Sequence, residues 1–119
     1  MYQDEQNYRQ DQPYSAIRKT IETKVAGVTF EGRQRVVASL QVGEPVVLTR
    51  EPENRYDANA IRVERVDGAQ IGYIPREIAG RIAPFMDEDG EPLHGTVSYL
   101  TGSSCYGYSL GVVIRFQLP

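Results

Sequence analysis

Residues 46–63 constrain the fold most, because they place two short strands around a polar loop that suits neither a helix nor a continuous sheet. The apolar run 46–48 indicates a buried strand, and Pro52, which lacks an N–H, ends its hydrogen-bonded ladder. From residue 60 onward, apolar and polar residues alternate, which predicts a half-buried strand. The loop between the strands carries Asn54, Arg55, Tyr56, Asp57 and Asn59. Binding groups usually lie on loops that a rigid scaffold holds, so this loop is the first candidate site.

The rest of the chain predicts more short strands and two helices. We expect strands at residues 23–30, 45–49, 60–66, 70–74, 96–100 and 108–118, and helices at 33–41 and 75–86. Asp67-Gly68 between alternating runs is a hairpin signal, and residues 87–92 suggest an acidic turn. Arg33 and Gln34 are expected to point outward from their helix, and Ile17 with Ile21 fits either a helical turn or a lead-in strand. The fold class is therefore mainly β, a partly open six-stranded barrel with two short α-helices.

Length and composition favour one domain. At 119 residues, we expect a flexible acidic tail at 1–15 and a single barrel domain at 16–119. There is no apolar run of the ~20 residues that a membrane helix needs, so no membrane association is expected. The first residues are polar and acidic, unlike a secretory signal, and the lone Cys105 excludes an internal disulfide; these features favour a cytoplasmic location.

The charge balance argues against a protein that coats duplex DNA. The net charge is −3 and the pI is near 5.1, whereas duplex binders usually carry a strongly basic face. Part of the negative charge lies in the tail, which carries Asp4, Glu5 and Asp11 but only one basic residue, Arg9. A second acidic cluster comprises Asp87, Glu88, Asp89 and Glu91. Nucleic-acid binding by this chain would thus depend on a small pocket with a few guanidinium groups.

Enzyme signatures are weak. His94 and Cys105 have no surroundings that indicate a nucleophile pair, and residues 87–90 resemble a calcium loop whose downstream ligands are missing. Gly102-Ser103-Ser104 lacks the lysine and the spacing of a phosphate loop. We therefore expect no catalytic activity, no metal and no cofactor, and a small nuclease would need a metal cluster that the sequence does not offer.

Aromatic and basic residues near predicted loops favour single-stranded nucleic acid, which proteins bind by stacking and by cations. The aromatic candidates are Phe30, Tyr56, Tyr73, Tyr106 and Tyr108, and the cations are Arg33, Arg55 and Arg76. Phe30 fits a core position and a platform about equally, while Tyr73 and Tyr108 favour the core and Tyr56 favours exposure. Asn54, Asp57 and Asn59 also fit bonding within their own loop; for Asn59 this is the main expectation, whereas Asp57 stays open.

Three separated motifs resemble one family. The run Arg50-Glu51-Pro52-x-Asn54-x-Tyr56-Asp57-x-Asn59-Ala60-Ile61-x-Val63 resembles the central signature of the HIRAN domain. Residues 25–30 are similar to its opening strand, and residues 68–75 with Ile78-Ala79 to its strand-to-helix segment. The resemblance spans roughly residues 23–117 and implies a modified OB-like barrel. HIRAN domains occur in replication-fork-remodelling helicases and as stand-alone bacterial or phage proteins, and this chain resembles the latter type.

The resemblance implies recognition of the 3′ end of single-stranded DNA. In HIRAN domains of the helicase type, two aromatic residues at the positions of Phe30 and Tyr56 sandwich the terminal base. A carboxylate at the position of Asp57 accepts the free 3′-hydroxyl, and Asn54 and Arg76 match positions that contact phosphate. A further stacking aromatic falls near Tyr106 or Tyr108. The implied function is a non-enzymatic module in DNA repair or fork processing, with a helicase or nuclease as partner.

This chain departs from the helicase-type pattern at three positions. An arginine is replaced by Thr29, an aromatic by Glu31, and a histidine that helps with phosphate by Tyr73. One cation is lost and one anion is gained beside the implied pocket, so we expect weaker affinity or a different ligand. The alternative is a protein-interaction or adaptor domain on the same barrel that has lost DNA binding.

Overall fold

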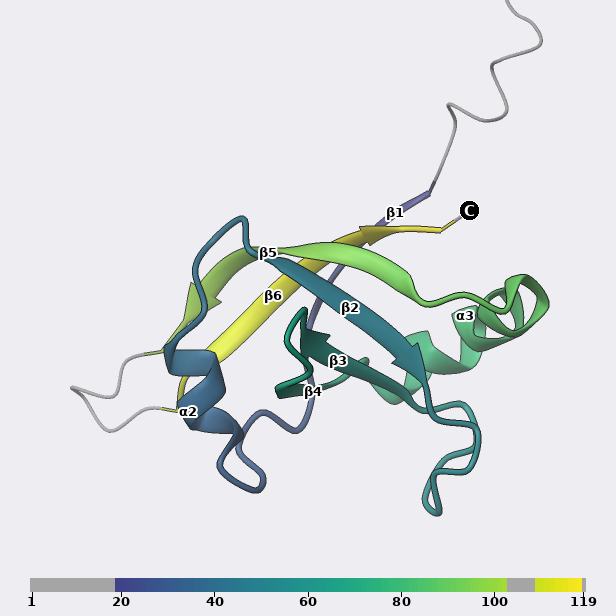
Figure 1. The fold of residues 1–119 in the computed structure, drawn as a ribbon, viewed down its shortest axis with the longest axis horizontal. Coiled ribbons are helices and arrows are strands. Elements are labelled where there is room, and N and C mark those ends of the chain that lie inside the picture. The colour runs from purple at the N-terminus through teal and green to yellow at the C-terminus, as the bar shows by residue number, and fades with distance from the viewer. Residues whose placement is uncertain (1–18, 103–108, 119) are drawn as a thin grey trace, which may run out of the picture.

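The structure, a computed structural model, describes residues 19–102 and 109–118 (Figure 1). The strands in these ranges are β1 (Thr20–Lys24), β2 (Pro45–Arg50), β3 (Ile61–Arg65), β4 (Gln70–Tyr73), β5 (Leu93–Thr101) and β6 (Gly111–Gln117). The helices are α2 (Arg33–Ala38) and α3 (Arg76–Asp89). The tail predicted at 1–15, and the site residues Tyr106 and Tyr108, lie outside the described residues.

All six strands belong to one antiparallel sheet in the order β1-β6-β5-β2-β3-β4. The sheet curls strongly, and α2 and α3 lie towards opposite ends of it (Figure 1). Just after β1, the N–H of Ala26 donates to the carbonyl of Tyr73 at 2.7 Å, and the N–H of Tyr73 donates back at 2.9 Å. This single bridge joins the two edges of the curled sheet. The predicted partly open six-stranded barrel is thereby confirmed.

The alternating strands are confirmed close to their predicted positions. Ile61 and Val63 of β3 are fully buried, while Arg62 between them is only half-buried. The Asp67-Gly68 turn also forms as predicted: Gly68 has a φ of 94°, and the Asp67 carboxylate accepts the N–H of Ala69. Apolar side chains on the inner face of the sheet form the core together with residues of both helices.

The predicted strand at 23–30 is wrong beyond its first residues. The ladder with β6 ends at Lys24, and Gly27 adopts a φ of 70° that turns the chain. The N–H of Phe30 then donates to the carbonyl of Gly27, so this residue lies in a turn and not in a sheet. The undecided segment before it is a strand, since Ile21 pairs with Phe116.

The predicted helix at 33–41 is shorter and rotated relative to the prediction. It ends at Ala38, and the side chain of Arg33, expected to point outward, belongs to a residue only 8% exposed. The amide of Gln34 is also turned inward, where it donates to the carbonyls of Val28 and Leu110 and accepts the N–H of Leu110. The polar groups of the neighbouring loops thus hold two side chains that helical periodicity places in solvent.

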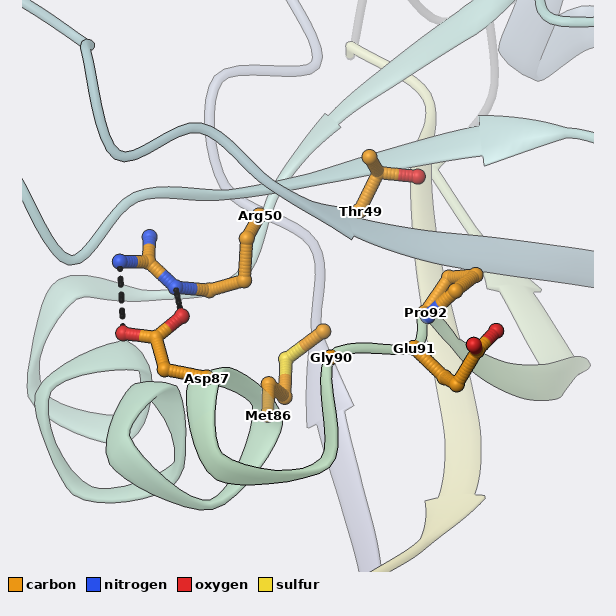
Figure 2. A pocket seen from close by; sticks show the side chains of 7 residues that line it. All are labelled: Thr49, Arg50, Met86, Asp87, Gly90, Glu91 and Pro92. Carbon is orange, nitrogen blue, oxygen red and sulfur yellow. Dashed lines mark hydrogen bonds and ion pairs between the residues drawn. The ribbon is translucent and has the colours of Figure 1, made fainter.

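The acidic turn predicted at 87–92 is in part helix, because α3 continues to Asp89 and ends at Gly90, whose φ is 79°. Arg50 of β2 holds this last turn: its Nε donates to Asp87 Oδ1 at 2.8 Å and its Nη2 to Oδ2 at 3.2 Å (Figure 2). A cavity of about 300 Å³ lies beside this pair. None of the helices in the described ranges is both long enough and apolar enough to cross a bilayer.

Candidate nucleic-acid interface

Two adjoining cavities meet where the turn after β1 approaches the β2–β3 loop. The first, named the Asp57 cavity, has a volume of about 470 Å³ and is lined by Ala26, Phe30, Asn54, Tyr56, Asp57, Ala60, Tyr73, Ile74 and Arg76. The second, named the Arg33 cavity, has a volume of about 720 Å³ and is lined by Ala26, Gly27, Phe30, Glu31, Arg33, Asn54, Arg55, Tyr56 and Tyr73. The six described site residues predicted from the sequence therefore all line one cavity.

Phe30 and Tyr56 are the exposed aromatic rings of this region. Their residues are 64% and 80% exposed, respectively, although large aromatic side chains normally contribute to the core. The core position that the sequence allowed for Phe30 is wrong, because the turn at Gly27 carries its ring out of the sheet. Both rings line both cavities, so a planar group in either cavity lies close to them.

The amide of Asn54 holds the β2–β3 loop in shape. Its Oδ1 accepts the backbone N–H groups of Tyr56 at 2.9 Å and Asp57 at 3.1 Å. Its Nδ2 donates to Glu51 Oε1 at 3.0 Å, which leaves one of the two amide N–H groups outside these contacts. Bonding within the loop, the alternative that the sequence left open, is thus present for Asn54 and is compatible with one further hydrogen bond to a ligand.

Glu51 supports the site from outside both cavities, through Asn54 and Tyr73, and the sequence analysis missed this role. Its Oε1 accepts both Asn54 Nδ2 and, at 2.8 Å, the hydroxyl of Tyr73, while its Oε2 lies 3.8 Å from Arg62 Nη1. Burial, reinforced by the hydrogen bond to the Glu51 carboxylate, raises the pKa of Tyr73. Tyr73 is half-buried, so its phenol is a structural donor towards Glu51 as well as a wall of both cavities. Glu51 thereby joins the loop to β4.

Asp57 presents a carboxylate with a cation beside it. Its Oδ1 accepts the backbone N–H of Asn59 at 2.9 Å, and its Oδ2 lies 3.6 Å from Arg76 Nε. The side chain of Arg76 is 76% exposed and reaches the Tyr56 carbonyl at 3.4 Å from the first position of α3. The carboxylate is consequently fixed in place but retains acceptor capacity. No group of acidic, histidine or cysteine side chains in the described ranges has the composition of a metal site.

A guanidinium group lies near each exposed ring. The guanidinium carbon of Arg33 is 5.9 Å from the centroid of the Phe30 ring and 5.4 Å from that of Tyr73. That of Arg55 is 5.8 Å from the centroid of Tyr56. Cations at such distances are attracted by the ring faces and add positive potential to the walls of the site.

The sequence of the chain matches one family model. The model of the HIRAN domain matches residues 19–118. The Helicase-like transcription factor of Oryctolagus cuniculus is 46% identical over 56 residues, which are 47% of this chain and 6% of that protein. The Fanconi-associated nuclease 1 homolog of Arabidopsis thaliana is 32% identical over 95 residues, 80% of this chain and 10% of that protein. The chain therefore spans a small part of the curated relatives that it matches.

Solved structures share the fold. A protein from Lactobacillus plantarum is 29% identical with a TM-score of 0.62, covering 84% of this chain and 98% of that one. The crystal structure of the HIRAN domain of human HLTF is 28% identical with a TM-score of 0.60, covering 83% and 75%. The HLTF HIRAN domain in its DNA-bound conformation is 27% identical with a TM-score of 0.54, covering 82% and 72%. The expected OB-like variant of the barrel agrees with these neighbours.

Proposed function

The chain belongs to the HIRAN domain family, and from that premise we propose that it binds the 3′ end of single-stranded DNA. Phe30 and Tyr56 stack on the terminal base, Asp57 accepts the 3′-hydroxyl, and Arg76 with the remaining amide N–H of Asn54 contacts the first internucleotide phosphate. The domain itself does no chemistry in this proposal, and its role is to bring processing or repair factors to exposed ends.

The observation that carries the proposal is a fixed carboxylate in a cavity between two exposed aromatic rings. A hydroxyl donates a hydrogen bond to a carboxylate, whereas an internal nucleotide would place a phosphate there and be repelled. Asp57 is held by the N–H of Asn59 and by the approach of Arg76, so little reorganisation is needed to accept the hydroxyl. End selectivity thus follows from one anion, and general affinity from stacking.

The comparisons support the DNA part of the proposal. The HLTF HIRAN domain, which shares this fold, has been solved in a DNA-bound conformation. The names of the matched relatives place such domains in a helicase-like factor and in a nuclease homolog. We therefore extend the proposal to a helicase or nuclease as functional partner, in DNA repair or fork processing.

The test compares a short oligonucleotide ending in a free 3′-hydroxyl with the same oligonucleotide ending in a 3′-phosphate, by fluorescence anisotropy at low salt. We expect tighter binding of the hydroxyl end by the unmodified protein, and loss of that preference in Asp57→Asn. Asp67→Asn is a matched control, because the carboxylates of Asp57 and Asp67 each accept the N–H two residues ahead. The control should keep the preference.

Equal binding of both ends by the unmodified protein would refute end recognition. Binding of neither oligonucleotide would favour the protein-interaction alternative, to which the exposed Glu31 beside the cavities would contribute. In a separate variant, Tyr56→Ala should weaken binding by about 1–3 kcal/mol if Tyr56 is a stacking platform.

A further inference from the structure

We infer that the Arg33 cavity is a second subsite of the interface, which takes the phosphodiester of the second internucleotide linkage from the 3′ end. The inference rests on the proposed function, because it follows the strand away from its end in the Asp57 cavity. It assigns Arg33 and Arg55 as the cations of this subsite and Glu31 as the anion that occupies it in the absence of ligand.

The two cavities are continuous around the same aromatic pair. The residues that line both cavities are Ala26, Phe30, Asn54, Tyr56 and Tyr73. A DNA strand whose terminal base lies between the two rings therefore leaves the Asp57 cavity by way of the Arg33 cavity. The Asp57 cavity holds one carboxylate and one arginine, whereas the Arg33 cavity holds two arginines and one carboxylate. The change in charge from one cavity to the next suits a polymer that ends in a hydroxyl and continues in phosphates.

Arg33 supplies a buried positive charge at this subsite. Its residue is 8% exposed, and its Nη1 donates to the Gly27 carbonyl at 2.8 Å. In the described ranges, Arg33 forms an ion pair with Glu31, in which Arg33 Nη2 lies 3.4 Å from Glu31 Oε1. The side chain of Glu31 is 82% exposed. An exposed partner on a flexible side chain neutralises a buried charge poorly, because water screens it and ordering it costs side-chain entropy. Arg33 therefore retains affinity for an anion.

Arg55 supplies the second cation and is exposed. In the described ranges it has no ion pair and no hydrogen bond, and its guanidinium lies 5.8 Å from the Tyr56 ring. An exposed side chain without a partner reorganises at little cost when a phosphate arrives. The two guanidinium groups reach the same cavity from different elements, since one belongs to α2 and the other to the β2–β3 loop.

Glu31 takes the place of a phosphate in the free protein. Its backbone has a φ of 49°, the one non-glycine residue with positive φ in the described ranges, and its carboxylate lies on Arg33. A phosphate entering the subsite displaces this carboxylate and makes the same kind of charge-assisted hydrogen bond. The carboxylate of Glu31, which stands where the helicase-type pattern has an aromatic residue, thereby competes weakly with the phosphate for Arg33.

The test uses oligothymidylates of one length with a free 3′-hydroxyl and a single neutral methylphosphonate at the first, second or third linkage from that end. We expect the neutral second linkage to weaken binding about three- to tenfold, the effect of one net hydrogen bond. Arg55→Gln should weaken binding of the unmodified oligonucleotide similarly, and the neutral second linkage should cost this variant less than it costs the unmodified protein, because only Arg33 remains at the subsite. Arg81→Gln, an exposed arginine that lines neither cavity, is the control and should behave as the unmodified protein.

The competitor role of Glu31 is tested separately. Glu31→Gln should tighten binding, while Glu88→Gln, which changes the net charge equally at an exposed site on α3, should not.

Arg55→Gln should also reduce the slope of the logarithm of the binding constant against the logarithm of the salt concentration by about 0.7, the value of one phosphate contact on a single strand. Preference for the hydroxyl end with no effect of the second linkage would overturn this inference and leave the proposed function intact. Loss of the hydroxyl preference itself would overturn both.

Discussion

Replacing Asn54 by aspartate removes one hydrogen bond at the centre of the β2–β3 loop. The carboxylate in Asn54→Asp still accepts the N–H groups of Tyr56 and Asp57, because one oxygen keeps the position of Oδ1. It cannot donate to Glu51, and it places a second carboxylate where a donor now lies 3.0 Å from Glu51 Oε1. We expect loss of folding stability and of oligonucleotide affinity, because the loop that carries the site loses its attachment.

The magnitude follows from two terms. The lost hydrogen bond to a charged acceptor is worth about 1.5–3 kcal/mol where it is fully desolvated, and less at this half-buried position. Two like charges about 3 Å apart repel by about 1–6 kcal/mol at dielectric constants between those of water and of a protein surface. Relaxation of the side chains reduces the sum, so we expect Asn54→Asp to lower the free energy of unfolding by about 2–4 kcal/mol at neutral pH.

Urea denaturation at pH 7 measures the loss. Asn59→Asp is the control, since it adds the same charge to the same loop at an exposed position. The double variant Asn54→Asp/Glu51→Gln restores a donor opposite an acceptor, with donor and acceptor exchanged, and keeps the net charge of the unmodified protein. It should recover part of the lost stability, because the Tyr73 hydroxyl, which also donates to Glu51 Oε1, loses its charged acceptor.

Two results would refute this reasoning. A loss in Asn54→Asp no larger than that in Asn59→Asp would mean that the contact with Glu51 contributes nothing to the loop. Absence of recovery in the double variant would mean that the loss comes from elsewhere in the site.

Three further predictions concern the frame around the site. Gly72→Ala should lower the free energy of unfolding in urea by about 2–4 kcal/mol, because its methyl group would collide with the Ala26 carbonyl of the closing bridge; a change below about 0.5 kcal/mol would contradict this. Tyr73→Phe should cost about 1 kcal/mol and remove a late component from the spectrophotometric tyrosine titration, since the pKa of Tyr73 is raised by burial and by its hydrogen bond; an unchanged titration would argue against that contact. Arg50 lowers the pKa of Asp87, so this carboxylate stabilises the fold above the ordinary aspartate pKa, and the contribution is lost as pH falls through the lowered value. Asp87→Asn should therefore melt below the unmodified protein at pH 7 and together with it in strong acid; an equal difference at both pH values would refute the assignment.

Local patterns were sufficient for the central strands and for the loop between them. The alternation at Ile61 and Val63 and the turn at Asp67-Gly68 depend on neighbours in sequence, and both appear where predicted. The loop residues were also placed correctly, because proline and short polar side chains determine local backbone geometry. The cavity itself required the family resemblance, since its walls come from segments far apart in the chain.

The errors arise where a distant partner overrides the local pattern. Periodicity placed Arg33 in solvent, but the Gly27 carbonyl and the face of Tyr73 draw its guanidinium inward. The β-forming residues around Gly27 predicted a continuous strand, although that glycine turns the chain. Glu51 was part of a quoted motif, yet nothing in its neighbourhood revealed a hydrogen bond to a phenol 22 residues away.

The bridge between Ala26 and Tyr73 couples ligand binding to the integrity of the fold. One pair of backbone hydrogen bonds joins the sheet edges there, whereas the other strands are joined by ladders, so this contact opens at a lower free energy than they do. Phe30 follows on one side of it, and Tyr73 lines the cavities on the other. A ligand that spans both sides binds only the closed form, and by thermodynamic linkage it protects the amides of Ala26 and Tyr73 from hydrogen exchange. Occupancy of the site and closure of the barrel are then coupled equilibria.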